Sequence, residues 1–421
     1  MTNQGKFRGW ILEANSRGAS AVLALALALL LTVVMTPSAQ AQSYSVLYSF
    51  TGAADGAYPY GGVIVDAAGN LYGTTFQGGY LKGCGLFQGC GVVFKVDPSG
   101  KQTVLHTFKG NSDGRQPYFG NLLRDKSGNL FGTTVYGGMK GNIGLGTAFE
   151  VATIGRETIL HRFAGGPKDG EEPTAGLILD ANGDFYGTTV AGGNGPYGGY
   201  GTVYRMSKSG KVTVLHSFTG DDGVEPTGWL TQDAAGNFYG TAITGGSTGA
   251  GTVFKITKTG KFTLLYTFKG APGDGYLPEG ALALDKAGNL YGATSEGGDA
   301  TACPAFGCGV IFKISNKGKE SVLHIFIGPD GAAPSGGVLL DAAGNLYGTT
   351  WAGGAHGNGS IFKLDASGKL TTLYSFTGGT DGGLPFAGLT EDEAGNFYGT
   401  TNLGGITKCE SGCGVVFKLT P

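Results

Sequence analysis

One six-residue pattern occurs seven times in the sequence, and this repetition constrains the fold more than any other feature. The pattern is N-L/F-Y/F-G-T-T with small changes, its starts are 51 to 59 residues apart, and it begins at Asn70, Asn129, Asp184, Asn237, Asn289, Asn345 and Asn396. Three other segments surround each copy in fixed order: an apolar run that ends in Asp, a G-x-x-F/Y segment followed in most copies by Lys (G-x-x-F/Y-K), and an L-H/Y-x-F segment. Each is short, rich in β-branched and aromatic residues and bounded by turn residues, which is typical of strands. Four short antiparallel strands per unit, named A to D here, predict a β-propeller blade.

The two ends of the repeat region complement each other. The first unit is preceded by a lone strand D, YSVLYSF from Tyr44, whereas the last unit ends at strand C, GVVFKLTP, without a strand D. One strand from the start and three from the end make one blade, and ring closure removes exposed sheet edges. We therefore expect an all-β, seven-bladed β-propeller over residues 42–421. An open stacked array would not account for the missing strand being found at the other end.

The first 41 residues differ from the rest. Lys6, Arg8 and Arg17 precede an apolar run from Ala21 to Met35, and Ala39-Gln40-Ala41 follows. This order is typical of a secretory signal peptide cleaved after Ala41. The apolar run is shorter than the ~20 residues that span a bilayer. We expect a secreted, periplasmic or cell-surface protein without a membrane span after signal removal.

The repeats resemble a known family. The [ND]-[LF]-[YF]-G-T-T and G-x-x-F-K segments over residues 43–421 are similar to the GloVer tandem repeats of exported bacterial proteins, some of the choice-of-anchor type. Their broader kin form propellers in sensor kinases and lyases. The resemblance implies the propeller fold and little about activity, because propellers host many functions. A formal net charge of -2 gives no footprint for nucleic acid or anionic lipid.

Features present in all seven units are interpreted as architecture, because one active site needs asymmetry. Four of the five histidines share one position in strand D with three tyrosines, which indicates a packing position with a polar tip: His106, His161, His216 and His324, with Tyr48, Tyr266 and Tyr374. The Asp of each Asp-Gly-x-x-Pro segment is interpreted as a turn residue, because each unit offers too few oxygen ligands for calcium. We expect no metal site, no cofactor and a monomer.

Six cysteines fall in the three longest loops between strands B and C, two in each loop. The pairs are Cys84 with Cys90, Cys303 with Cys308, and Cys409 with Cys413. Their spacings differ from the CXXC of redox motifs and zinc knuckles, so in an oxidising compartment they predict three local disulfides. A crossed pairing between the first and third loops, at the seam of the ring, is the main alternative.

The face that carries the B-to-C and D-to-A connections varies most between copies, and loops on a rigid scaffold are where binding usually occurs. Five breaks in the repeat symmetry are therefore candidate ligand-binding residues: Arg115, Asn121, Trp229, Trp351 and His356. Asn121 and Trp229 replace Gly or Ala at a position near the axis, and His356 is the one histidine outside strand D.

Three functions fit these observations. The first is a non-catalytic exported module that binds a protein, glycan or small molecule on the variable face. The second is a lyase or hydrolase at the channel mouth, for which His356 with Glu171, Glu172, Glu225, Glu279 or Glu296 would supply the acid and base. A third is a purely structural surface role. The sequence leans toward the first, because it contains no recognisable catalytic motif.

Overall fold

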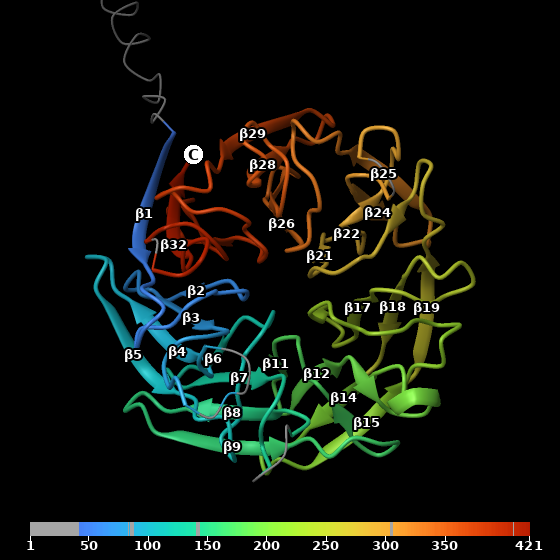
Figure 1. Cartoon of the computed structure of the whole chain (residues 1–421). Helices are drawn as coiled ribbons and strands as arrows, with labels where there is room; N and C mark the ends of the chain where they lie inside the picture. Colours follow the sequence, from blue (N-terminus) through green and yellow to red (C-terminus); the bar gives the residue numbers. More distant parts are fainter. Residues whose placement is uncertain (1–41, 83, 85–87, 140–143, 304–305, 407) are drawn as a thin grey trace, which may run out of the picture. The chain divides into compact units, whose positions relative to one another are not determined.

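A computed structural model describes residues 42–421, apart from 83, 85–87, 140–143, 304–305 and 407. The expected signal peptide, residues 1–41, lies outside the described residues. Residues 43–420 form one compact unit that contains seven four-stranded antiparallel sheets. These sheets are arranged in a ring, with the short strands A toward the centre and the strands D at the rim (Figure 1). The predicted seven-bladed β-propeller is therefore confirmed.

The first three blades follow one another along the chain. Blade 1 contains β2 (Ile64–Val65), β3 (Leu71–Thr75), β4 (Val92–Val96) and β5 (Gln102–Thr107). Blade 2 contains β6 (Leu123–Arg124), β7 (Leu130–Thr134), β8 (Thr147–Val151) and β9 (Glu157–Arg162). Blade 3 contains β11 (Ile178–Leu179), β12 (Phe185–Thr189), β14 (Thr202–Met206) and β15 (Val212–Ser217).

The other blades repeat this order. Blade 4 contains β16 (Thr231–Gln232), β17 (Phe238–Ala242), β18 (Thr252–Ile256) and β19 (Phe262–Thr267). Blade 5 contains β21 (Ala283–Leu284), β22 (Leu290–Thr294), β24 (Val310–Ile314) and β25 (Glu320–Ile325). Blade 6 contains β26 (Val338–Leu340), β27 (Leu346–Thr350), β28 (Ser360–Leu364) and β29 (Leu370–Ser375). Blade 7 contains β30 (Thr390–Glu391), β31 (Phe397–Thr401), β32 (Val415–Thr420) and β1 (Ser43–Ser49).

A few short elements lie outside the blades. Two-stranded ladders join β10 (Gly170–Glu171) to β13 (Ala191–Gly192), and β20 (Gly275–Tyr276) to β23 (Glu296–Gly297). A 3-10 turn covers Pro196–Gly198. In the part of the chain that the structure describes, no helix has the length and apolar character needed to cross a membrane.

The first and last strands close the ring. Strand β1 pairs antiparallel with β32, from Ser43 opposite Thr420 to Ser49 opposite Val415. Blade 7 therefore takes one strand from the start of the repeat region and three from its end, as the sequence predicts.

The Gly that begins each G-T-T segment allows strand B to pack under an aromatic ring of strand C. A Cβ atom on Gly240, for example, would lie 2.6 Å from Cζ of Phe254, and equivalent close approaches recur in every blade. The Phe that ends each L-H/Y-x-F segment then packs edge-on against the strand C aromatic of the next blade. Phe218 and Phe254 are both fully buried, with ring centroids 5.3 Å apart. Two repeated motifs thus build the interface between blades.

Two further repeated motifs are bonded to each other. In six of the seven blades the strand D His or Tyr is hydrogen-bonded to the Asp of the following Asp-Gly turn. Tyr48 Oη lies 2.8 Å from Asp55, and His216 Nε2 lies 2.9 Å from Asp222. The side chains predicted as a packing position and a turn residue therefore form one unit, which ties the outer strand to the connection into the next blade.

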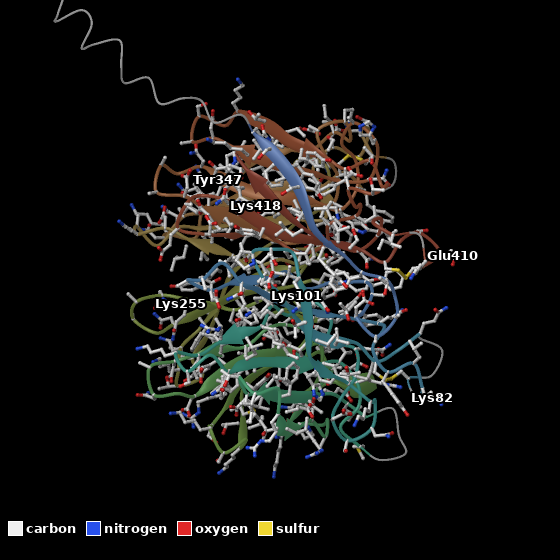
Figure 2. All side chains as sticks on the ribbon, turned by 90° about the vertical axis from the view of Figure 1, so that its left-hand side faces the viewer. Lys82, Lys101, Lys255, Tyr347, Glu410 and Lys418 are labelled. Atoms are coloured by element: carbon white, nitrogen blue, oxygen red, sulfur yellow. A yellow bond between two sulfur atoms is a disulfide. The ribbon has the colours of Figure 1, made fainter. Side chains whose placement is uncertain are left out.

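The B-to-C and D-to-A connections lie on one face. Bridges join Ala57 to Gln77 and Arg115 to Tyr136, each between a D-to-A connection and the start of a B-to-C loop. In the side view, Lys82 and Glu410, from the B-to-C loops of blades 1 and 7, lie at the same edge (Figure 2). We call this the variable face.

Candidate functional site: a cavity on the propeller axis

A cavity of about 480 Å³ lies where the strands A and the D-to-A connections of the blades meet. Its inner wall consists mostly of small residues that begin the strands A, such as Gly280, Ala281, Gly336 and Gly388. Neighbouring blades touch at these positions, because Cβ atoms on Gly280 and Gly336 would clash with the main chain of Gly337 and Gly388. The wider part of the cavity is lined by the residues that flank the Pro of each D-to-A connection. The volume is within the range of about 300–1,000 Å³ typical of small-molecule sites.

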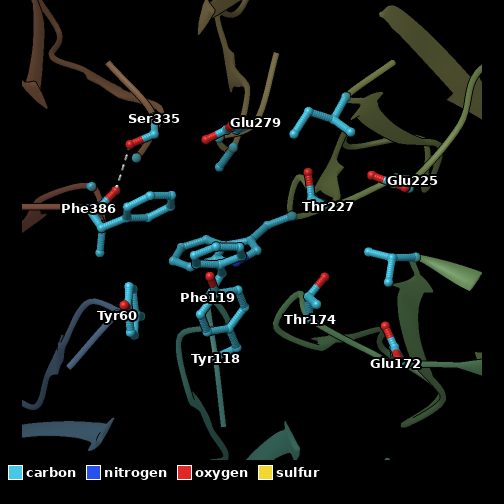
Figure 3. Close-up of a pocket in the computed structure, with 18 residues that line it drawn as sticks. Tyr60, Tyr118, Phe119, Glu172, Thr174, Glu225, Thr227, Glu279, Ser335 and Phe386 are labelled. Atoms are coloured by element: carbon cyan, nitrogen blue, oxygen red, sulfur yellow. Dashed lines mark hydrogen bonds between the residues drawn. The ribbon is translucent and has the colours of Figure 1, made fainter. Parts of the chain in front are cut away.

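One side of the cavity is aromatic. Phe119 stacks on Phe386 with ring centroids 4.5 Å apart, and Tyr60 lies 4.9 Å from Tyr118 and 6.0 Å from Phe386. Figure 3 shows these four rings together on one side of the cavity. Burial raises the pKa of the Tyr118 phenol, so this hydroxyl stays protonated. Trp229 also lines the cavity and adds a fifth ring.

The opposite side is acidic and rich in hydroxyl groups. Glu172, Glu225 and Glu279 line it, with Thr174 and Thr227 between the glutamates (Figure 3). The Oγ1 atoms of both threonines are buried and have no hydrogen-bond partner in the described structure. Of the described residues that line the cavity, none is Lys, Arg or His. The site therefore presents carboxylates and free hydroxyls to a ligand, without a balancing cation.

Burial raises the pKa of two of these carboxyl groups. Burial, against a hydrogen bond from Ser295 and together with the charge of Glu296, raises the pKa of Glu279 to about 7. Burial also raises the pKa of Glu172, together with repulsion from Glu171 and Glu225. The raised pKa values mean that an ionised carboxylate without a counter-charge is unfavourable in this cavity.

The backbone fixes Glu172 and Glu225 in place. Each precedes the Pro of its D-to-A connection and has a φ of 56°, a left-handed conformation that non-glycine residues rarely adopt. Two main-chain bonds hold each one: Glu172 N donates to Leu145 O at 2.8 Å, and Glu172 O accepts from Val190 N at 3.2 Å. The same conformation recurs before every Pro, at Tyr58, Gln116, Leu277, Ala333 and Leu384. The scaffold therefore holds whatever side chain each blade offers at this position.

The disulfides support this arrangement from the neighbouring loops. Cys84 is bonded to Cys90, Cys303 to Cys308 and Cys409 to Cys413, so the local pairing is confirmed and the crossed pairing is not formed. The carbonyl of the second cysteine of each pair also accepts a hydrogen bond from the N–H of the left-handed residue of the next blade. Cys90 O accepts from Gln116 N, Cys308 O from Ala333 N, and Cys413 O from Tyr58 N. Each staple therefore anchors the backbone that bears part of the site.

Three of the five candidate residues lie at or beside the axis. Trp229 lines the main cavity, and Trp351, 39% exposed, lines a smaller cavity of about 200 Å³ that shares Glu279 with it. Asn121 packs against Gly62 and Gly176 of the adjoining blades, and its buried Oδ1 has no hydrogen-bond partner in the described structure.

The other two candidates lie elsewhere. Arg115 sits on the D-to-A connection with its guanidinium 5.6 Å from the Tyr136 ring, and burial lowers its pKa. His356 is exposed on its loop and lines neither cavity. The structure thus groups Glu172, Glu225 and Glu279 around one space without His356.

Sequence reasoning missed the aromatic side of the cavity. The residue after each Pro lines the site, yet its identity differs between blades, being Tyr60, Tyr118, Thr174, Thr227, Glu279, Ser335 and Phe386. The available signal in the sequence was a variable residue directly after a constant Asp-Gly-x-x-Pro motif. A second signal is one inserted residue in blade 2, where Tyr118 is followed by Phe119 before the conserved small residue.

Comparisons with solved structures support the fold. A gluconolactonase from Xanthomonas campestris is 16% identical, with 73% of this chain and 86% of that chain covered and a TM-score of 0.44. The extracellular domain of a protein assigned as a one-component system of B. thetaiotaomicron is 9% identical, with a TM-score of 0.54, and the match covers 89% of this chain and 39% of that one. The match with a TM-score of 0.54 supports a shared fold, and at these identities neither match carries an activity over to this chain.

The relationship by sequence is more specific. No curated protein matches the chain. The three disulfides point to an exported protein, because disulfides persist in oxidising compartments. The profile of the Gloeobacter/Verrucomicrobia repeat matches residues 82–306 and 304–421. With the seven-bladed ring in place, the chain belongs to the Gloeobacter/Verrucomicrobia repeat family.

Proposed function

We propose that the protein is a secreted or periplasmic binding module that holds a small organic cation in the axial cavity. The observation that carries this proposal is that an aromatic side faces three glutamates, with no positively charged residue among the described residues that line the cavity. Aromatic rings and carboxylates together recognise ammonium groups, because the faces of the rings attract cations and the carboxylates supply the opposite charge. A neutral sugar does not require this combination of aromatic rings and carboxylates.

The electrostatics of the free cavity support a cationic ligand. Burial and neighbouring charge raise the pKa values of Glu279 and Glu172, so their ionised forms are unfavourable without a counter-charge. A bound cation would lower both pKa values, so its binding would release protons and become weaker as the pH falls. Glu225 also lines the cavity and is exposed, so it can attract a cation from solvent.

Calorimetric titration with choline, tetramethylammonium and putrescine, and with glucose as a neutral probe, tests the proposal. We expect the cations to bind and glucose not to bind, with affinity that falls as salt concentration rises. The double variant Glu172→Gln/Glu225→Gln should weaken choline binding about tenfold or more. Glu393→Gln, an exposed acid on an A-to-B turn outside the cavity, is the matched control. Glucose binding that is unaffected by salt and by the double variant would contradict the proposal.

One observation favours hydrolysis at the same site as a second candidate. The pKa of Glu279 is raised to about 7, which suits a general acid or base at neutral pH, and its Oε1 lies 3.3 Å from Ser295 Oγ. A screen of esters, lactones and glycosides tests this function. Turnover that is abolished in Glu279→Gln and retained in Glu393→Gln would establish it, whereas turnover that is unchanged in Glu279→Gln would exclude Glu279 as its acid or base.

A further inference from the structure

The outer rim of the propeller carries seven equivalent pairs of a strand D His or Tyr and a turn Asp, and six of them are closed. The distances between their polar atoms are 2.8–3.0 Å, in the pairs Tyr48–Asp55, His161–Asp169, His216–Asp222, Tyr266–Asp274, His324–Asp330 and Tyr374–Asp381. Each closed pair satisfies its donor and acceptor, which buried polar groups require.

The pair between blades 1 and 2 is open. His106 Nε2 lies 3.8 Å from Asp113 Oδ2, beyond hydrogen-bond distance, and 3.7 Å from Glu157 Oε2. Three buried atoms here lack any hydrogen-bond partner in the described structure: His106 Nε2, Asp113 Oδ1 and Glu157 Oε1. Each of the three side chains offers a ligand atom, and these atoms lie within 4.8 Å of one another. One imidazole nitrogen and two carboxylates therefore lie close together without hydrogen bonds between them.

Glu157 explains why this copy differs from the others. The residue four positions before each strand D His or Tyr packs over the pair of the preceding blade, and Phe262, for example, stacks on His216 with centroids 3.8 Å apart. The seven residues at this position are Tyr44, Gln102, Glu157, Val212, Phe262, Glu320 and Leu370. Only blade 2 places a glutamate over a histidine, because Glu320 meets the closed pair of Tyr266 and Asp274.

The carboxyl groups of Asp113 and Glu157 both lie beside His106, and Lys109 and Arg162 are charged neighbours of the cluster. A divalent cation among the three side chains would offset the charges of both carboxylates.

We propose that His106, Asp113 and Glu157 bind one zinc ion. A tetrahedral zinc ion with ligands at 2.0–2.1 Å separates its ligand atoms by about 3.4 Å. The separations of 3.7 and 3.8 Å approach this value within a few tenths of an ångström, whereas the closed pairs leave no space for an ion. One imidazole with two carboxylates suits zinc better than magnesium or calcium, which take only oxygen ligands.

The position of the site indicates a structural role. His106 belongs to β5 of blade 1, Asp113 to the connection into blade 2, and Glu157 to β9 of blade 2. A bound ion would cross-link two neighbouring blades at the rim, away from the axial cavity. This inference does not depend on the function proposed for that cavity.

Equilibrium dialysis of the untagged protein against Zn²⁺, followed by metal analysis, tests the site. We expect one zinc per chain that is lost in His106→Tyr and in Glu157→Val. Both substitutions copy residues found at the equivalent positions of other blades. Tyr beside a glutamate, as in His106→Tyr, already occurs in the Tyr266–Asp274–Glu320 cluster. The matched controls are His216→Tyr and Glu320→Gln, which should keep the zinc.

Two further measurements make the test decisive. Zinc should raise the melting temperature of the wild type and of the controls, and leave that of His106→Tyr unchanged. Co²⁺ in place of zinc should give a visible absorption band that is absent in His106→Tyr. No bound zinc in the wild type, retention of that zinc by His106→Tyr, or tighter binding of Ca²⁺ or Mn²⁺ than of Zn²⁺ would overturn the proposal.

Discussion

Tyr44 of the first strand stacks on Tyr374 of blade 6, with ring centroids 3.9 Å apart and ring planes 9° from parallel. Its hydroxyl donates to the main-chain oxygen of Asp381 at 2.5 Å. Strand β1 thus pairs with β32 on one side and packs against blade 6 on the other. The closure of the ring depends on side-chain contacts of this strand as well as on its main-chain ladder.

Tyr44→Ala should therefore lower the free energy of unfolding by about 3 kcal/mol, because it removes a packed ring and a hydrogen bond at the seam. Denaturant titration followed by tryptophan fluorescence measures this change. Tyr80→Ala, at an exposed ring, is the control and should change stability little. Equal effects of the two substitutions would show that the seam does not limit stability.

Trp229→Gly should preserve the fold and weaken binding at the axis. Four other blades have glycine at the equivalent position, at Gly62, Gly176, Gly337 and Gly388, so the backbone tolerates it. Removing the ring takes one aromatic face from the cavity, and we expect choline affinity to fall about tenfold or more. Calorimetric titration measures the affinity, and circular dichroism checks the fold. Unchanged affinity would place the ligand away from this ring.

Glu279 should make stability depend on pH between about 4.5 and 7. Its pKa rises from 4.5 to about 7 on folding, so its ionisation is less favourable in the folded chain than in the unfolded one. Stability from this residue is fully present below pH 4.5 and is lost as the pH rises through 7. Glu279→Gln should match the wild type at pH 4 and exceed it at pH 8 by at most about 3 kcal/mol. Denaturant midpoints at both pH values, with Glu393→Gln as the control, check this sign.

The oxidised protein should contain no free thiol after denaturation. All six cysteines are paired within their own loops, and the described chain has no unpaired cysteine. A thiol titration in guanidinium chloride measures the number directly. Two or more free thiols per chain would contradict the pairing.

Gly240→Ala should destabilise the protein by about 2 kcal/mol or more, because the added methyl group would lie 2.6 Å from the Phe254 ring in a packed core. Gly379→Ala is a suitable control, since this glycine lies on a surface connection and its nearest neighbour, a Thr377 side-chain atom, is 3.2 Å away. Thermal melts of the two variants compare them. A small effect at Gly240 would mean that the ring can move aside.

The sequence determined the blades, their number and the closure of the ring. It did so because strand patterns, turn residues and interblade contacts are local or recur at a fixed period, so seven copies repeat the same information. The pairing of Cys84 with Cys90 could be predicted for the same reason, since both lie in one short loop. Trp229 could be recognised because it departs from a repeated small residue.

Only the tertiary structure decided which departures meet. Glu172, Glu225 and Glu279 come from three blades, and their shared cavity with Tyr60 and Phe119 depends on the inward direction of the segment around each Pro. Likewise, Glu157 acquires its significance from the histidine of the preceding blade, which the chain places 51 residues earlier. A closed ring brings residues that are distant in the sequence to one axis and packs each blade against its neighbour. These contacts depend on the packing of several blades, so they cannot be derived from a single repeat.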